Sequence, residues 1–511
     1  MLDKRPGCGF LSSPPGVPAT SRERDTTLSI RLPKQCNSEG VVMVATLHPR
    51  DAAHIYAEDD RNQASVLDAY VLGASEHDLS HSGICAWLEP RLRSSPILTS
   101  RLSRVPLDLD YPAWDPDPGF AIAEHVTVVE VGNPGKESLR HELGGLLASP
   151  MDLSVSPWHL YVFTNVRGVL GITEGDAIAV LKFHHSVGDA MTTAELAERM
   201  FGSRIDGTDD PAVGPATQVN SRLVALVRAI ATAPHAIIRF GMGMRDSRRA
   251  QRKLRDKVDV RELALPPTAW PKTRFNVMFS GSSVVDVVSF DLAAVRQICR
   301  RMPGVTVNDV VMTVIAGAMS TYLEEKGEHP EGPMGAKVPI SLRKVEESDA
   351  NNRFALASVD LGAHATDQRK RLEFIHTAML SEKARCADET VRGVEGVGET
   401  VPLVLMKLMM VVHRRSAREI PDMVAGGSTM ISNVRRSDAA LTVCGAPVVG
   451  GFGLLTLADG NGLNHFVTSV GRDLTIGVTA DVGALPEIDH YSDLLRESFA
   501  QLVDAVDEPG R

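Results

Sequence analysis

The chain has 511 residues, of which 43% are hydrophobic and 23% are charged, so it has the composition of an ordinary globular protein and the length of two or three domains. A fibre, a wholly disordered chain and a small disulfide-built scaffold are excluded. The 54 basic and 64 acidic residues give a formal net charge of −10. This is the wrong sign for a surface that neutralises phosphates, so we expect no nucleic-acid partner.

The cysteines and the N-terminus indicate a cytoplasmic protein. The six cysteines stand far apart, with no Cys-x-x-Cys pair, as expected of reduced thiols. Residues 1–44 are rich in proline, glycine, serine and charge, which predicts a disordered extension. A secretory signal requires an apolar stretch after its basic residues, and none follows those of this segment. Either Met1 or Met43 could be the initiator.

Three apolar stretches are long enough to raise the question of a membrane span. The charge-free run at 439–458 is broken by glycine and proline and predicts two buried strands joined by turns. The stretch at 223–240 is interrupted by Arg228 and Pro234, and the stretch at 403–412 is short, so neither is predicted to cross a bilayer. We expect both to be cover helices, with a position on a membrane surface as the alternative.

Strand and helix patterns alternate along the chain and predict an α/β fold with two halves, at 45–202 and 273–511. The linker at 203–272 contains a basic stretch at 245–257, expected to be a solvated helix, with lipid headgroups or a nucleotide phosphate as alternative partners. A cleft between two halves is a favoured ligand site. The expected elements, in chain order, are helix 52–58, strands 69–72 and 125–131, helix 138–147, strands 160–165, 177–183 and 284–290, helices 292–301 and 308–323, strands 338–341 and 355–361, helix 366–383, strand 474–480 and helix 491–504.

The segment 180–190, Val-Leu-Lys-Phe-His-His-Ser-Val-Gly-Asp-Ala, is the most informative motif, because nucleophile-elbow, Walker, dinucleotide and zinc-protease motifs are all missing. Successive side chains of a strand point to opposite sides, so His184 and His185 cannot both face one substrate. Imidazole accepts a proton near neutral pH and suits a general base. Asp189 is expected to cap the following helix or to pair with an arginine. Two histidines of no chemical importance are the alternative; a zinc site of these three residues is disfavoured, because the adjacent histidines diverge.

At this motif the sequence resembles the bacterial wax ester synthase/diacylglycerol acyltransferase family, whose members carry His-His-x-x-x-Asp-Gly. The likeness extends from Leu47 to the C-terminus. Further segments that resemble family signatures are 47–52, Trp114, 117–120, 125–126, 150–158, 271–276, 306–311, 339–343, 352–355, 432–434 and 462–464.

The resemblance implies two chloramphenicol-acetyltransferase-like α/β domains with an active-site tunnel at their interface. It implies that His185 is the general base, while His184 and Asp189 shape the loop. The implied reaction is direct transfer of an acyl group from acyl-CoA to diacylglycerol or a long-chain alcohol, without a covalent acyl-enzyme.

Asn308, in the family's Asn-Asp motif, is the candidate donor to the oxyanion of the tetrahedral intermediate. Thr306 and Asp309 have the spacing of a capping box, so a purely structural role for Asn308 at a helix start is the alternative. Ser432 and Asn433 are secondary candidates, expected in a turn or strand crossover.

Acyl-CoA is the implied co-substrate, with no separate cofactor and no metal. Because the acceptor is oily, we expect peripheral association with the inner membrane or a lipid droplet, through 245–257 and 403–412. Ala190 replaces the glycine usual in the family, and Leu153 and Val155 stand where arginines are common. These departures leave two alternatives open: an acyltransferase for another complex lipid, and a catalytically impaired lipid-binding relative.

Overall fold

The computed structural model describes residues 46–73, 78–92, 95–131, 135–166, 177–202, 222–328, 332–342, 350–365, 367–416, 419–436 and 440–507, with two short strands before them. Those strands, β1 (Lys34–Cys36) and β2 (Val42–Val44), pair antiparallel. Within the expected extension at 1–44, the structure describes only these two strands. The other residues for which disorder was expected lie outside the described residues.

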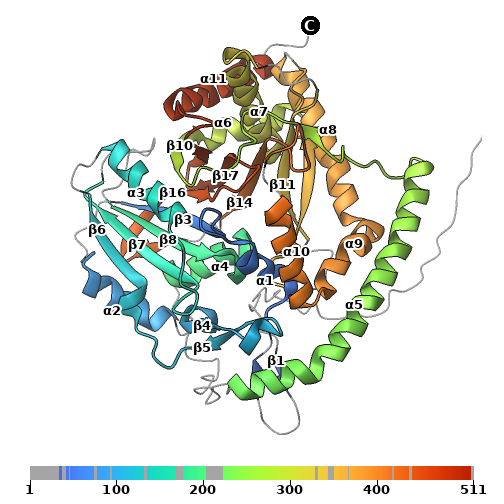
Figure 1. Ribbon diagram of the computed structural model, residues 1–511. Coiled ribbons are helices and arrows are strands. Elements are labelled where there is room, and N and C mark those ends of the chain that lie inside the picture. The colour runs from blue at the N-terminus through green and yellow to red at the C-terminus, as the bar shows by residue number, and fades with distance from the viewer. Residues whose placement is uncertain are drawn as a thin grey trace, which may run out of the picture.

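The first sheet has six strands in the order β15-β16-β3-β8-β7-β6 and forms the lower left of Figure 1. Its central strands β3 and β8 are buried along their whole length, which explains their nearly unbroken apolar sequences. Lys182 on β8 is one exception: its ammonium is buried and donates to Leu146 O at 2.6 Å and to Ser149 O, at the C-terminus of α3. Burial lowers the pKa of this lysine to about 8. The elements of this part are α1 (Pro49–Ala57), β3 (Ser65–Leu72), α2 (His81–Leu92), β4 (Ser100–Ser103), β5 (Ala113–Pro116), β6 (Val126–Glu130), α3 (Lys136–Ala148), β7 (Trp158–Thr164), β8 (Ala177–His184) and α4 (Ala190–Phe201).

The second sheet also has six strands, in the order β10-β18-β17-β14-β11-β12, and lies under helices α6, α7, α8 and α11 at the top of Figure 1. Apolar side chains of these helices and strands form one continuous core. The elements are β9 (Trp270–Pro271), β10 (Ser283–Asp291), α6 (Leu292–Arg301), α7 (Val307–Glu325), β11 (Gly335–Ser341), β12 (Phe354–Asp360), α8 (Gln368–Ala387), β13 (Met423–Val424), β14 (Thr429–Arg435), β17 (Leu463–Val470), β18 (Asp473–Asp481) and α11 (Ile488–Asp507). The mixed α/β fold with two such parts agrees with the sequence prediction.

Two features connect the two parts: a strand pair from the later sequence that joins the first sheet, and a buried ion pair. The strands β15 (Thr442–Val443) and β16 (Ala446–Leu455) form a hairpin, as predicted for the charge-free run, but they join the first sheet, where β16 pairs antiparallel with β3. The first sheet thus includes strands from the range 273–511, which the sequence assigns to the second half. Arg140 on α3 also pairs with the fully buried Asp286 on β10, at 2.6 Å. Removing one partner of such a buried pair typically costs about 3–5 kcal/mol, because the other charge is left buried without a partner.

Helix α5 (Arg222–Asp259) corrects one prediction. It is a single helix of 38 residues, and Arg228 and Pro234 do not interrupt it. A proline removes only one backbone hydrogen bond, and here the carbonyl left over belongs to Ile230, which is exposed and can be solvated by water. By length and composition, α5 is the one helix among the described residues that could cross a membrane, so the expectation that it could not is wrong. The bent pair of α9 (Glu389–Glu395) and η5 (Gly396–Thr400) with α10 (Leu403–Ser416), at 100°, passes the same test together.

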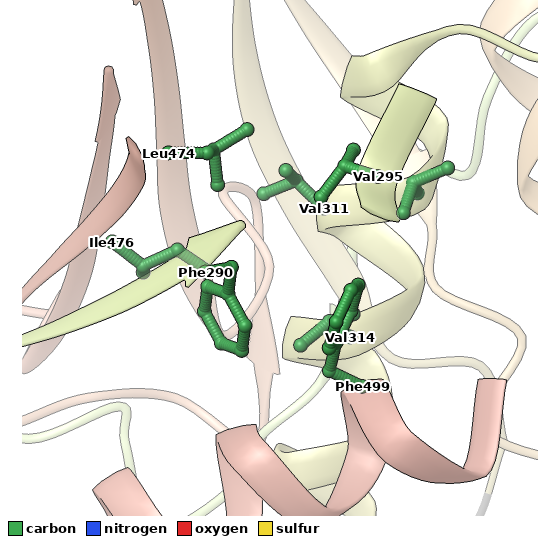
Figure 2. A pocket seen from close by; sticks show the side chains of 8 residues that line it. Phe290, Val295, Val311, Val314, Leu474, Ile476 and Phe499 are labelled. Atoms are coloured by element: carbon green, nitrogen blue, oxygen red, sulfur yellow. The ribbon is translucent and has the colours of Figure 1, made fainter. Parts of the chain in front are cut away.

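A small gap lies in the core of the second sheet, between its strands and helices α6, α7 and α11 (Figure 2). All eight lining side chains are apolar, so the gap offers no group for chemistry and is a packing feature. It is lined by Phe290, Val295, Val310, Val311, Val314, Leu474, Ile476 and Phe499. The active-site tunnel implied by the resemblance is not this gap and stays a prediction.

Candidate active site

The histidine loop, residues 184–189, is held at the end of the central strand β8. The N–H of His184 donates to Pro157 O at 3.0 Å, and the N–H of His185 donates to Ala64 O at 2.8 Å. The strands on either side of β8 therefore fix the main chain at the point where the sheet ends. A rigid strand end is a suitable place for a group that must keep its direction.

His184 is fully buried and is used for support. Its Nδ1 accepts the N–H of Ser186 at 3.1 Å, and its Nε2 lies 3.2 Å from Glu58 Oε1. Burial acts to raise the pKa of Glu58, but the hydrogen bond and charge of His184 and the N–H of Ala64 outweigh it, and the pKa is lowered. Glu58 is thus a carboxylate that orients His184.

His185 has different neighbours, as the alternation of side chains on a strand predicts. Its ring is partly buried and stacks on that of His54, with 5.1 Å between centroids and 27° between planes. Its Nδ1 is enclosed and has no hydrogen-bond partner in the described part of the chain. Burial, followed by the charge of His184, lowers the pKa of His185 to about 4, against the opposing charges of Asp189 and Glu58. The ring is therefore neutral at pH 7, with a lone pair free to accept a proton.

Asp189 has the architectural position that the sequence predicts. It is the N-cap of α4: its Oδ1 accepts the N–H of Thr192 at 2.9 Å and the Thr192 hydroxyl at 3.0 Å. Its Oδ2 accepts the backbone N–H of Arg353 at 3.2 Å. This second contact joins the histidine loop to the chain between β11 and β12.

Residues 351–353, here called the asparagine segment, dock on the histidine loop from the second part of the molecule. The buried carboxylate of Asp51 accepts the N–H groups of Asn351 at 3.0 Å and of Asn352 at 2.9 Å. The amide Nδ2 of Asn352 donates to Asp51 at 2.8 Å and to His185 O at 2.9 Å. Burial raises the pKa of Asp51 to about 6, although these donors act to lower it. Two carboxylates from the first part, Asp51 and Asp189, thus hold one segment of the second.

The structure explains why alanine can occupy position 190, where the family usually has glycine. Ala190 is the first residue of α4 and has an ordinary helical backbone, so it needs no glycine. The glycine that the loop requires is Gly188, with φ of 158°, where an added Cβ would lie 2.6 Å from the side chain of Thr192.

Asn308 is the second residue of α7 and lies between Thr306 and Asp309, the two residues of the predicted capping box. The Thr306 N–H donates to Asp309 Oδ2 at 2.8 Å and the Thr306 hydroxyl accepts the N–H of Asp309, which confirms the box. Asn308 Oδ1 accepts from Asn433 Nδ2 at 3.3 Å, so the structure brings these two candidates together. Ser432 and Asn433 lie within β14, not in a turn as expected. Within the described residues, the amide of Asn308 contacts Asn433 and Met312, so its role as oxyanion donor stays a prediction.

Sequence reasoning missed His54 and Glu58 and gave Asp51 no role beyond a family signature. Asp51 and His54 lie on α1 and Glu58 is its C-cap; steps of three and four positions place the three side chains on one face of that helix. A polar stripe at helical spacing on a predicted helix was the available signal. The described residues contain no group of three or more His, Cys, Asp or Glu side chains that could hold a metal ion.

Comparison with known proteins gives the context of this geometry. The profile of the wax ester synthase/diacylglycerol acyltransferase catalytic domain matches residues 47–311, and that of the WS/DGAT C-terminal domain matches residues 350–503. The chain belongs to the wax ester synthase/diacylglycerol acyltransferase family. It is an acyltransferase, as the histidine motif indicates.

Relatives of this WS/DGAT-family chain cover most of its length. Two similar proteins of Mycobacterium tuberculosis are named as diacylglycerol O-acyltransferases. One is 25% identical over 497 residues, covering 92% of each chain. The other is 26% identical over 401 residues, covering 77% of this chain and 84% of the relative. The solved wax ester synthase/diacylglycerol acyltransferase from Marinobacter aquaeolei VT8 is similar in fold, with a TM-score of 0.60 and 20% identity, covering 90% of this chain and 100% of that one. The TRI3 trichothecene 15-O-acetyltransferase from Fusarium sporotrichioides has a TM-score of 0.55 at 10% identity, covering 94% and 99%.

Ala190→Gly is expected to leave acyl transfer nearly unchanged in this enzyme, because the position is already helical. The free energy of unfolding should fall by about 0.5–1 kcal/mol at most, measured by urea denaturation. As a control, Gly188→Ala should lower both stability and turnover through its clash with Thr192. A large gain in turnover for Ala190→Gly would show instead that the alanine impairs the site.

Proposed function

We propose that this enzyme transfers the acyl group of acyl-CoA to the free hydroxyl of diacylglycerol, forming triacylglycerol, and that it also esterifies long-chain alcohols to wax esters. The observation that carries the proposal is the partly buried imidazole of His185 at a rigid strand end, where burial lowers its pKa. The family and the names of the mycobacterial relatives support this substrate class. Acyl-CoA is a co-substrate in this reaction, and the proposal includes no metal or other cofactor.

The proposed step is a direct transfer. Nδ1 of His185 is enclosed, so we assign proton acceptance to Nε2. Nε2 takes the proton of the acceptor hydroxyl as its oxygen bonds to the thioester carbonyl carbon. The carbon–sulfur bond then breaks, and the imidazolium returns the proton to the departing thiolate. The products are the ester and free coenzyme A, with no covalent acyl-enzyme.

The supporting residues have separate duties in this proposal. His184, oriented by Glu58, fills the inner side of the loop, and Asp189 fixes the start of α4. Asn308 donates to the oxyanion, held in direction by its contact with Asn433. The lipid-binding alternative loses one support, because the alanine at position 190 does not strain the loop.

We also propose that α5 and α10 attach the enzyme, on the cytoplasmic side, to the inner membrane or to a lipid droplet. At 100° per residue, seven exposed apolar residues in the first half of α5 share one face of the helix. They are Leu223, Val224, Val227, Ile230, Ile237, Ile238 and Met242. The same face continues into exposed Arg245, Arg248, Arg249, Arg252 and Arg255. An apolar stripe followed by arginines fits an interface with anionic headgroups.

Helix α10 adds a second apolar face beside the site. Val404, Leu408, Met409, Val411 and Val412 are exposed on it, and Figure 1 shows α10 with α9 between α5 and the body of the molecule. Helix α10 also packs against α1, since Arg414 donates to Tyr56 O at 2.8 Å and to Glu58 O. Membrane contact through α10 would therefore bring an oily acceptor close to the helix that supports the histidine loop.

His185→Ala should lower kcat by about 10²–10⁴ because it removes the base. The measurement is ester formation from labelled palmitoyl-CoA with diolein, hexadecanol and a glycolipid acceptor. His159→Ala is the control, since His159 is a partly buried histidine on β7 whose ring contacts that of Tyr161. Esterification of the glycolipid alone would identify another complex lipid as acceptor, and palmitoyl-CoA binding without turnover would identify a lipid-binding relative; either result contradicts the proposal.

The kcat/KM of the enzyme should fall only at acid pH, near pH 4. Protonated His185 cannot accept a proton, so kcat/KM falls as the pH drops through its pKa of about 4 and stays level above the ordinary histidine value of 6.5. Assays from pH 4 to 8, with stability checked at each pH, measure this limb. An acid limb at or above pH 6.5 would contradict the assignment.

Reversal of three arginines on α5 (Arg248→Glu, Arg249→Glu, Arg252→Glu) should lower partition onto vesicles with anionic phospholipid about 100-fold, at about 1 kcal/mol per basic residue. The measurement is co-sedimentation at low and high salt. The same reversal at Arg296, Arg300 and Arg301 on α6 is the control for net charge. Equal binding by both triple variants would remove α5 from the proposed surface.

A further inference from the structure

His54 contacts the base directly, although it lies outside the histidine motif. It is on α1, between Asp51 and Glu58, and its ring stacks on that of His185 with 5.1 Å between centroids. Both other residues of this face have polar partners in the loop or the asparagine segment. In the described part of the chain, no residue hydrogen-bonds to the ring of His54, so the stack is its defining contact.

A base imidazole needs a fixed ring plane, because rotation about its last side-chain torsion is broad and would turn Nε2 away from the substrate. The usual restraint is a hydrogen bond from Nδ1 to a carboxylate or carbonyl. His185 lacks that restraint among the described residues, since its Nδ1 is enclosed and unpartnered. An aromatic face in contact is the alternative restraint, and stacked pairs are worth about 0.5–1.5 kcal/mol beyond their buried area.

The position of His54 is itself well fixed. Asp51, one turn before it, is held by the two backbone N–H groups of the asparagine segment. Glu58, one turn after it, accepts the N–H of Ala64 at 2.9 Å, and Arg414 of α10 closes the C-terminus of α1. A side chain on a helix fixed at both ends is a rigid wall for the ring beside it.

Burial favours the neutral imidazole at both rings at rest. The titratable groups that act on them are His184 at the end of β8, Asp189 at the start of α4, and Glu58 at the C-cap of α1. Burial, followed by the charges of His185 and His184, lowers the pKa of His54 well below its usual value. His54 therefore offers a neutral aromatic face when His185 takes up the substrate proton, and does not compete for that proton.

We propose that His54 is a positioning residue for His185, whose ring plane it fixes by stacking in place of a hydrogen bond at Nδ1. This inference rests on the proposed function, in which Nε2 of His185 is the base. The important property is the aromatic face of residue 54, not its nitrogens.

Three variants test the proposal. His54→Ala removes the face and should lower kcat about 10- to 100-fold with little change in KM, as expected when a catalytic group loses its direction. His54→Phe keeps the face and should restore kcat to within about threefold of the original. His159→Phe alters a histidine on β7 whose ring is tilted against that of Tyr161; it is the control and should change neither constant. Thermal unfolding followed by circular dichroism confirms that each variant is folded.

A second readout does not depend on turnover. Loss of the stack should expose His185 and speed its carbethoxylation by diethyl pyrocarbonate in His54→Ala but not in His54→Phe, measured by mass spectrometry of the peptide. An unchanged kcat in His54→Ala, or equal losses in both variants with equal modification rates, would overturn the proposal. If the unaltered enzyme forms no ester at all, the proposed function fails, and the modification rates still decide whether His54 restrains His185.

Discussion

The contact between one face of α1 and the histidine loop is the constraint on which the site depends. Asp51, His54 and Glu58 lie on that face, and each has a different partner: the asparagine segment, the ring of His185 and Nε2 of His184. A helix can hold three groups in fixed relation because its side chains repeat every turn. The end of strand β8 positions the two histidines, and the side chains on this face of α1 provide different contacts for each of them.

The site also requires both parts of the molecule. Buried carboxylates on the first part bind the backbone of the asparagine segment on the second, while β16 crosses in the other direction to complete the first sheet. Each carboxylate that lost its N–H partners would be buried without compensation, which is costly. The geometry around His185 is therefore coupled to the packing of the two parts, since Asn352 also donates to His185 O.

The local sequence predicted the elements that are determined locally. The apolar run at 177–183 predicted β8, and the spacing of Thr306 and Asp309 predicted the capping box at the start of α7. The position of β16 in the first sheet was not predictable, because pairing with β3 joins residues almost 400 positions apart and leaves no local pattern. Helices were expected at 223–240 and 245–257, but the continuity of α5 through both was not, because Pro234 was expected to interrupt it. The role of α1 was missed because a polar stripe on a short helix has the same appearance as a solvated face.

The central claim is that His185, held by α1, takes the proton of the acceptor hydroxyl. It is tested most directly by a crystal structure of the protein with a non-reactive thioether analogue of acyl-CoA. The account predicts that the carbon replacing the thioester carbonyl lies beside Nε2 of His185, with the ring of His54 still stacked on the imidazole. An analogue bound with its reacting end away from His185, or an imidazole turned from it, would contradict the account.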